Sequence, residues 1–178
     1  LSGVSERQTT NTMSMVLQMI GEGPLGDTYG VDPGLTRVYT YGGGRLDPIS
    51  ASAPTAEGAR PTFVIEDETH LWTKTNGGEA LDRVNRRNLG KSRDGSARCL
   101  ETTNAHAAGE DSVAERSYLA WLAMTEGRAM GSVLYDAREA DAETDMGDEA
   151  SLLSGLGEAY GDSVWVDLAR IRDEVWDP

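Results

Sequence analysis

One short apolar run, Thr62-Phe-Val-Ile-Glu66, constrains the fold of this chain more than any other feature of its sequence. A proline precedes the run and acidic residues follow it. A continuous apolar stretch of this length is typical of a strand that is buried on both faces of a parallel sheet. Such a sheet needs helices on both sides, so the run predicts an α/β layer architecture.

Other segments of the sequence fit this architecture. Ser5-Glu-Arg-Gln8 has the pattern of a capping box, and it predicts a helix that directly follows a strand ending near Val4. Further helices are expected at 79–89, from Asp111 onward, at 149–160 and at 163–176. In the helix that begins at Asp111, Tyr118 and Trp121 are expected to lie in the core. Strands are expected at 36–41, 46–53, 96–103 and 132–135, the first two joined as a hairpin by the glycines at 42–44, and 21–34 is expected to be a loop.

The acidic residues after the buried strand are candidates for catalysis. Asp67 and Glu68 follow the carboxyl end of the strand, where ligands bind in open parallel sheets. This is the form of a Walker B element, in which Asp67 would hold Mg²⁺ through a water and Glu68 would polarise the water that attacks the γ-phosphate of ATP. An isolated acidic triplet more often faces solvent, but the apolar strand before this one favours the catalytic interpretation.

The next predicted strand ends in Thr102, Thr103 and Asn104, whose hydroxyls and amide could sense the γ-phosphate at the same edge of the sheet. Thr-Asn after a strand is also ordinary turn chemistry. The triplet gains weight because it follows the acidic strand in the order that P-loop ATPases use. We therefore predict a P-loop NTPase-like α/β fold of the RecA type, with helices flanking a mainly parallel sheet.

A phosphate-binding loop is not found by its sequence pattern. Gly90-Lys91-Ser92 matches the end of G-x-x-x-x-G-K-[ST], but Asn85 stands where the first glycine belongs. The segment also closes a helix and follows the acidic strand, whereas a phosphate loop opens a helix and precedes that strand. We expect the phosphate loop to precede Leu1, so that the fold is incomplete at its N-terminus.

Composition disfavours several other classes of protein. The net charge of −14 argues against binding of nucleic acid by the surface as a whole, and the basic residues between Arg83 and Arg98 are expected to form a solvated helix face and loop. No apolar run is long enough to cross a membrane, which favours the cytoplasm. Cys99 is expected to be a buried thiol, and His70 and His106 structural residues, because neither histidine has partners at zinc-ligand spacing.

The run at 47–72, which contains the apolar strand and the acidic triplet, resembles the segment around Walker B in the large subunit of tailed-phage terminases. Similar features of that family are found at 4–11, 86–89, 101–104 and 109–115. Together these segments span nearly the whole chain.

This resemblance implies a motor that hydrolyses ATP with Mg²⁺ to pack double-stranded phage DNA into a procapsid in the host cytoplasm. The family's partners are a portal protein and a small terminase subunit, and the full-length protein would form a homo-oligomeric ring. Family roles carry over to Asp67 for Mg²⁺, to Glu68 for catalysis, and to the coupling motif from Thr102 to Asn104. Arg60, shortly before the acidic strand, is a candidate arginine finger for the nucleotide of a neighbouring subunit.

The resemblance also divides the chain. Residues 1–130 would be part of the ATPase domain, and 131–178 an acidic, helical linker towards a nuclease domain that is not recognisable in this sequence. The chain alone is therefore expected to be inactive.

Three alternatives stay open. Asp67-Glu-Thr-His70 fits the D-E-x-H pattern of helicases, which would make the chain a fragment of a DEAH-type helicase. The chain could also be an inactive prophage remnant or an interaction domain. A two-metal nuclease site is the third alternative, and strand alternation weakens it because Asp67 points away from Glu66 and Glu68.

Overall fold

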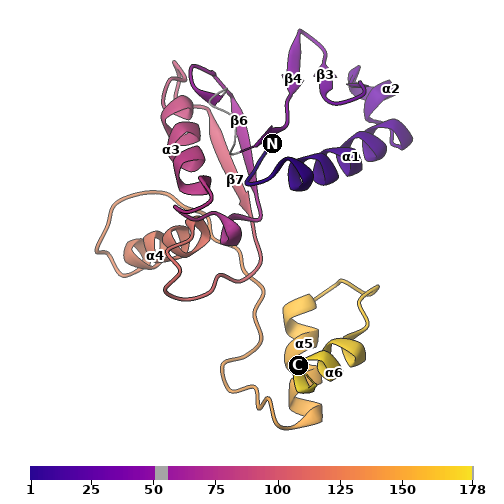
Figure 1. The fold of residues 1–178 in the computed structure, drawn as a ribbon, viewed down its shortest axis with the longest axis vertical. Helices are drawn as coiled ribbons and strands as arrows, with labels where there is room; N and C mark the ends of the chain where they lie inside the picture. Colours follow the sequence, from indigo (N-terminus) through magenta and orange to yellow (C-terminus); the bar gives the residue numbers. More distant parts are fainter. Residues whose placement is uncertain (51–55, 178) are drawn as a thin grey trace. The chain divides into compact units, whose positions relative to one another are not determined.

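The computed structural model describes residues 1–50 and 56–177, and the chain divides into two compact units, Leu1–Gly131 and Ser132–Pro178 (Figure 1). We call them the first and the second unit. The first unit contains a parallel sheet flanked by helices, so the expected fold class is confirmed. The assignment of 1–130 to an ATPase domain and of 131–178 to a linker stays a prediction.

The central sheet brings the two predicted strand ends together. Among the described residues its strand order is β5 (Ile49–Ser50), β1 (Ser2–Gly3), β6 (Phe63–Asp67) and β7 (Arg98–Thr102), and all neighbours are parallel. β6 and β7 pair along their whole length, with Asp67 opposite Thr102. Parallel strands paired in this register end at the same edge, so the acidic triplet and the Thr-Thr-Asn triplet become neighbours.

Helices cover both faces of the sheet. α1 (Glu6–Glu22) begins where the sequence predicts it, because Ser5 Oγ accepts the backbone N–H of Gln8 at 3.1 Å. The Gln8 side chain does not complete the capping box; it donates to the carbonyl of Asp67 instead, at 3.2 Å. α3 (Gly78–Leu89) packs on β6 and β7 from the opposite face, the face of Glu66 (Figure 1).

The core consists of two clusters, one for each side of the sheet. The first lies under α1 and contains Leu1, Met13, Ile20 and Val38, with Ile65 of β6 packed against it. The second lies beneath α3 and contains Ala56, Trp72, Leu81 and Val113. Trp72 follows the short 3₁₀ helix η2 (Thr69–Leu71) and is fully buried. The residues directly after the acidic triplet are therefore anchored in the core.

A second, antiparallel sheet contains the expected hairpin. Its strands are β2 (Asp32–Pro33), β3 (Val38–Thr40) and β4 (Gly44–Leu46). The prediction of one partner strand at 46–53 is wrong, because β4 ends at Leu46 and β5 joins the central sheet. Residues 51–53 of that expected strand lie outside the described residues.

Two further expectations in the first unit are wrong. The segment 21–34 is not only loop, because it contains the short helix α2 (Leu25–Tyr29), which begins after Pro24 and ends at Gly30 in the left-handed conformation. In α4 (Val113–Thr125), only the first turn reaches the core, through Val113 and Ala114. Tyr118 and Trp121 stay half-buried, with their ring centres 5.9 Å apart, and are not core residues.

The second unit consists mainly of α5 (Glu149–Tyr160) and α6 (Leu168–Trp176). α5 has the predicted bounds, but α6 begins later than expected because the Asp167 carboxylate caps it, accepting the backbone N–H of Arg170 at 3.1 Å. The predicted strand at 132–135 does not form, and Leu134 is 96% exposed. A strand needs a hydrogen-bonding neighbour, and the described residues of this unit provide none. Across the described residues, no helix combines the length and the apolar character that a membrane crossing requires.

Candidate functional site

The carboxylate of Asp67 is held from two elements. Its Oδ1 accepts a hydrogen bond from Thr102 Oγ1 at 2.8 Å, and its Oδ2 accepts one from Thr12 Oγ1 of α1 at 2.7 Å. The backbone carbonyl of Asp67 accepts the indole N–H of Trp72 at 2.9 Å and the side-chain amide of Gln8 at 3.2 Å. These donors fix both the side chain and the backbone of this residue.

Glu68 leaves the strand in an unusual backbone conformation. Its φ of 58° and ψ of 46° lie in the left-handed region, which residues other than glycine rarely adopt. Its N–H donates to the carbonyl of Thr102 at 2.7 Å, and its carbonyl accepts the N–H of Leu71 at 2.9 Å. Its carboxylate accepts Asn104 Nδ2 at 3.2 Å. Backbone strain of this kind is frequent at functional sites.

The structure thus gathers most of the residues predicted from sequence at one edge of the sheet. Asp67, Glu68, Thr102 and Asn104 contact one another directly, and Thr103 joins them through His70. Arg60 is not part of this cluster. It is exposed, precedes β6 at the opposite end of that strand, and makes no side-chain hydrogen bond or ion pair with the described residues.

Glu66, the first residue of the acidic triplet, faces the other side of the sheet. It is fully buried, and its Oε1 accepts Asn85 Nδ2 of α3 at 2.8 Å, while Cys99 Sγ lies 3.5 Å from its Oε2. Glu66 and Asp67 therefore point to opposite faces, as strand alternation predicts, which weakens the two-metal nuclease alternative. Cys99 is half-buried, and burial together with the nearby Glu66 raises the pKa of its thiol.

We expect Glu66 to make stability depend on pH. Burial raises the pKa of Glu66 to about 7, against an ordinary value near 4.5. The folded state therefore holds this proton more tightly than the unfolded chain does. The resulting stabilisation is complete below about pH 4.5, is lost as the pH rises through about 7, and is worth roughly 3 kcal/mol.

A Glu66→Gln variant should lose this dependence, because the neutral amide keeps an acceptor for Asn85 and has no proton to release. Urea unfolding at several pH values between 5 and 8 measures the effect, and the variant should be the more stable protein at pH 8. Parallel pH dependences of the two proteins would show that Glu66 does not titrate in this range.

Several residues of the site belong to no recognisable sequence motif. Gln8 and Thr12 lie one turn apart on α1, so both face Asp67. A polar pair at this spacing, on a helix that follows a strand, is the only available signal. β1, the turn at Val4 and Ser5, and α1 also have the strand, turn and helix order of a phosphate loop, although residues 4–11 contain no glycine and no lysine.

The donor atoms around Asp67 fit Mg²⁺. The ion prefers oxygen ligands, keeps several waters and uses only one or two carboxylates. Asp67 provides a carboxylate, with the hydroxyls of Thr12 and Thr102 beside it. Within residues 1–50 and 56–177, no three His, Cys, Asp or Glu side chains form a metal site by themselves. A cation here would need water or nucleotide oxygens to complete its coordination.

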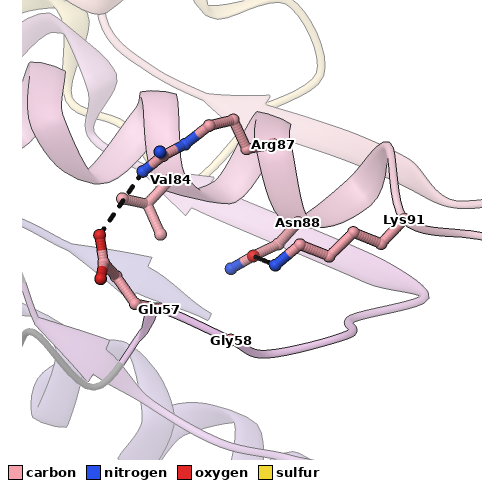
Figure 2. Close-up of a pocket in the computed structure, with 6 residues that line it drawn as sticks. All are labelled: Glu57, Gly58, Val84, Arg87, Asn88 and Lys91. Carbon is pink, nitrogen blue, oxygen red and sulfur yellow. Dashed lines mark hydrogen bonds and ion pairs between the residues drawn. The ribbon is translucent and has the colours of Figure 1, made fainter.

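A separate pocket of about 210 Å³ lies beside the C-terminal half of α3 and is lined by Glu57, Gly58, Val84, Arg87, Asn88 and Lys91 (Figure 2). Its basic side chains already have partners: Arg87 pairs with Glu57 at 3.6 Å, and Lys91 Nζ donates to Asn88 Oδ1 at 2.6 Å. None of the predicted catalytic residues lines it. The site at the strand ends is thus distinct from this pocket.

The chain is similar to known proteins of phages. No protein-family model matches the chain. The Gene 13 protein of Mycobacterium phage D29 is 35% identical over 195 residues, which cover 98% of this chain and 32% of that protein. The Gene 13 protein of Mycobacterium phage L5 is 33% identical over 195 residues, with the same coverage. The chain therefore spans about a third of the length of these curated relatives.

Among solved structures, the large terminase of bacteriophage HK97 matches with a TM-score of 0.64 and 18% sequence identity. The match covers 99% of this chain and 36% of that chain. The expected resemblance to a terminase large subunit is thus confirmed at the level of the fold.

Proposed function

We propose that this chain is part of the ATPase region of a tailed-phage terminase large subunit, and that the full-length protein drives DNA packaging. The fold shared with the HK97 large terminase and the similarity to two phage proteins support a packaging role. The observation that carries the proposal is the link between the two strand ends: Thr102 donates a hydrogen bond to Asp67, and Asn104 donates one to Glu68. Such a link is what an ATPase needs to connect hydrolysis with movement.

In this proposal each carboxylate has a different task. Asp67, together with the hydroxyl of Thr12, would hold Mg²⁺ beside the nucleotide. The ion, when bound, would supply positive charge to the phosphate oxygens. Glu68 would orient and polarise the attacking water. The two carboxylates lie next to each other at one strand end, and both are half-buried, which is consistent with these roles.

The triplet from Thr102 to Asn104 would report the state of the nucleotide. Thr102 contacts the side chain of Asp67 and, through its carbonyl, the backbone of Glu68. A shift of either acidic residue on loss of the γ-phosphate would therefore move the end of β7. Because β7 leads towards α4, the shift could pass to the rest of the first unit.

The start of α1 lacks the residues with which a phosphate loop binds nucleotide. That helix follows β1 directly, and Thr12 of its second turn contacts Asp67. Backbone N–H groups at a helix start attract phosphate, but a lysine usually adds a full charge there. Because residues 4–11 contain no lysine, we expect the 178-residue chain alone to bind ATP weakly and to hydrolyse none of it.

The remaining roles concern the full-length protein. Arg60, exposed on the first unit, would act on the nucleotide of a neighbouring copy within a homo-oligomeric ring. The second unit would link the ATPase to a nuclease domain. Double-stranded phage DNA, the portal protein and the small terminase subunit would be the partners, in the cytoplasm of the bacterial host.

An Asp67→Asn change tests the magnesium assignment. The amide lacks the charge that attracts the ion, so the full-length variant should lose the Mg²⁺-dependent part of ATP affinity, about tenfold or more. Isothermal titration with ATP, performed once in the presence of Mg²⁺ and once in the presence of a chelator, measures this part separately. Asp136→Asn, at an exposed position of the second unit, is the matched control. If the affinity for ATP depends on Mg²⁺ equally in the Asp67 variant and in the parent protein, Asp67 does not have this role.

A further inference from the structure

The Glu68 carboxylate is held on one oxygen only. Asn104 Nδ2 lies 3.2 Å from its Oε2, and His70 Nδ1 lies 3.3 Å from the same atom. Oε1 has no hydrogen-bond partner among the described residues. The side chain is 37% exposed, so Oε1 can reach solvent. One oxygen is thus fixed by two donors from different strand ends, while the other stays available to a water.

The hydrogen-bond network around Thr103 determines which nitrogen of His70 carries the proton. The hydroxyl of Thr103 donates to the carbonyl of Asn104 at 2.9 Å and accepts the backbone N–H of His70 at 2.9 Å. Its only proton is therefore used, although His70 Nδ1 lies 3.2 Å from the same oxygen. The carboxylate of Glu68 can only accept. His70 Nδ1 must therefore be protonated to satisfy both neighbours.

From this geometry we propose that His70 is a positioning residue for Glu68, which fixes Oε2 together with Asn104 and directs Oε1 towards the attacking water. The inference rests on the proposed ATPase function. It gives His70 a role beyond that of a structural histidine. The backbone of Glu68 is fixed in its left-handed conformation by Thr102 and Leu71, so the side chain needs only these two donors to adopt one orientation.

Substitutions at His70 separate this role from simple packing. In the full-length protein, His70→Ala should lower kcat about 10-fold to 100-fold and leave KM for ATP nearly unchanged, because a poorly oriented base affects the chemical step. Asn carries its amide nitrogen at the δ position, as Nδ1 is in histidine, so His70→Asn should restore most of the rate. Gln extends its nitrogen to the ε position and should not. His106→Ala is the control, because that ring packs beside Tyr118.

The contact itself can be tested without any activity. The chain has two histidines, so the ring ¹⁵N signals of His70 and His106 are easily distinguished. At a fixed neutral pH, Glu68→Gln should shift the Nδ1 signal of His70 and leave the signals of His106 in place. An unshifted His70 signal would overturn the proposal whatever the enzyme does.

The two experiments also distinguish this inference from the proposed function. If the parent protein hydrolyses ATP and His70→Ala does so equally well, His70 has no positioning role, and the ATPase assignment stands. If the parent protein hydrolyses no ATP, the function fails, and the imidazole signal still decides whether His70 holds Glu68. Equal activity of the Asn and Gln variants would likewise contradict donation from the δ position.

Discussion

A Glu68→Gln variant of the full-length protein should lose ATP hydrolysis by about 10²-fold to 10⁴-fold and keep its affinity for the nucleotide. The amide has nearly the shape of the carboxylate, and its oxygen can still accept the hydrogen bonds that Asn104 and His70 donate. It cannot take a proton from water or polarise it to the same degree. Phosphate release measures turnover, and a fluorescent ATP analogue measures binding.

The matched control for this change is Glu110→Gln. Glu110 is exposed in the loop before α4, so its substitution removes the same charge without touching either strand end. Normal turnover in the control together with a loss in the Glu68 variant assigns the chemistry to the strand end. Retained turnover in the Glu68 variant would remove Glu68 from the catalytic role, and comparable losses in both variants would point to a general effect of charge.

The sequence was sufficient to predict the two strand ends for a definite physical reason. A short apolar strand such as β6 is recognisable from composition alone, although Phe63 at its start is exposed and only Val64 and Glu66 are buried. Acid directly after such a strand has to lie at the sheet edge. The meeting of Asp67 with Thr102 then follows from parallel pairing in register. Local sequence patterns were therefore sufficient to predict this part of the site.

The partners that come from other elements could not be predicted in this way. Thr12 is separated from Asp67 by 55 positions, and the contact depends on how α1 packs beside the sheet. Trp72 reaches back to Asp67 only because η2 turns the chain into the core. The expected strand at 132–135 failed for a related reason, since apolar residues form a strand only where a neighbour can pair with them. Tertiary packing decides each of these cases.

The largest loss of stability should come from Trp72→Ala. The side chain is fully buried, packs with Leu81 and Val113, and donates its indole N–H to the carbonyl of Asp67. Removing a buried aromatic ring of this size costs about 3–5 kcal/mol, because its transfer energy is lost and a cavity remains. That is a large fraction of the roughly 5–15 kcal/mol by which domains are stable. Urea unfolding followed by circular dichroism measures the change.

Two further variants separate packing from the hydrogen bond to the acidic strand end. Trp72→Phe keeps most of the ring but removes the indole N–H, so it should cost less stability and still disturb Asp67, whose carbonyl would keep only the donor from Gln8. Trp165→Ala removes an equally large side chain that is 80% exposed, and it should change stability by no more than about 0.5 kcal/mol.

If the Phe variant is nearly as stable as the parent protein and yet binds Mg²⁺-ATP more weakly, Trp72 supports the site through its indole N–H. If the Phe variant binds Mg²⁺-ATP normally, Trp72 acts only as a core residue, and the position of Asp67 depends on Thr12, Thr102 and Gln8.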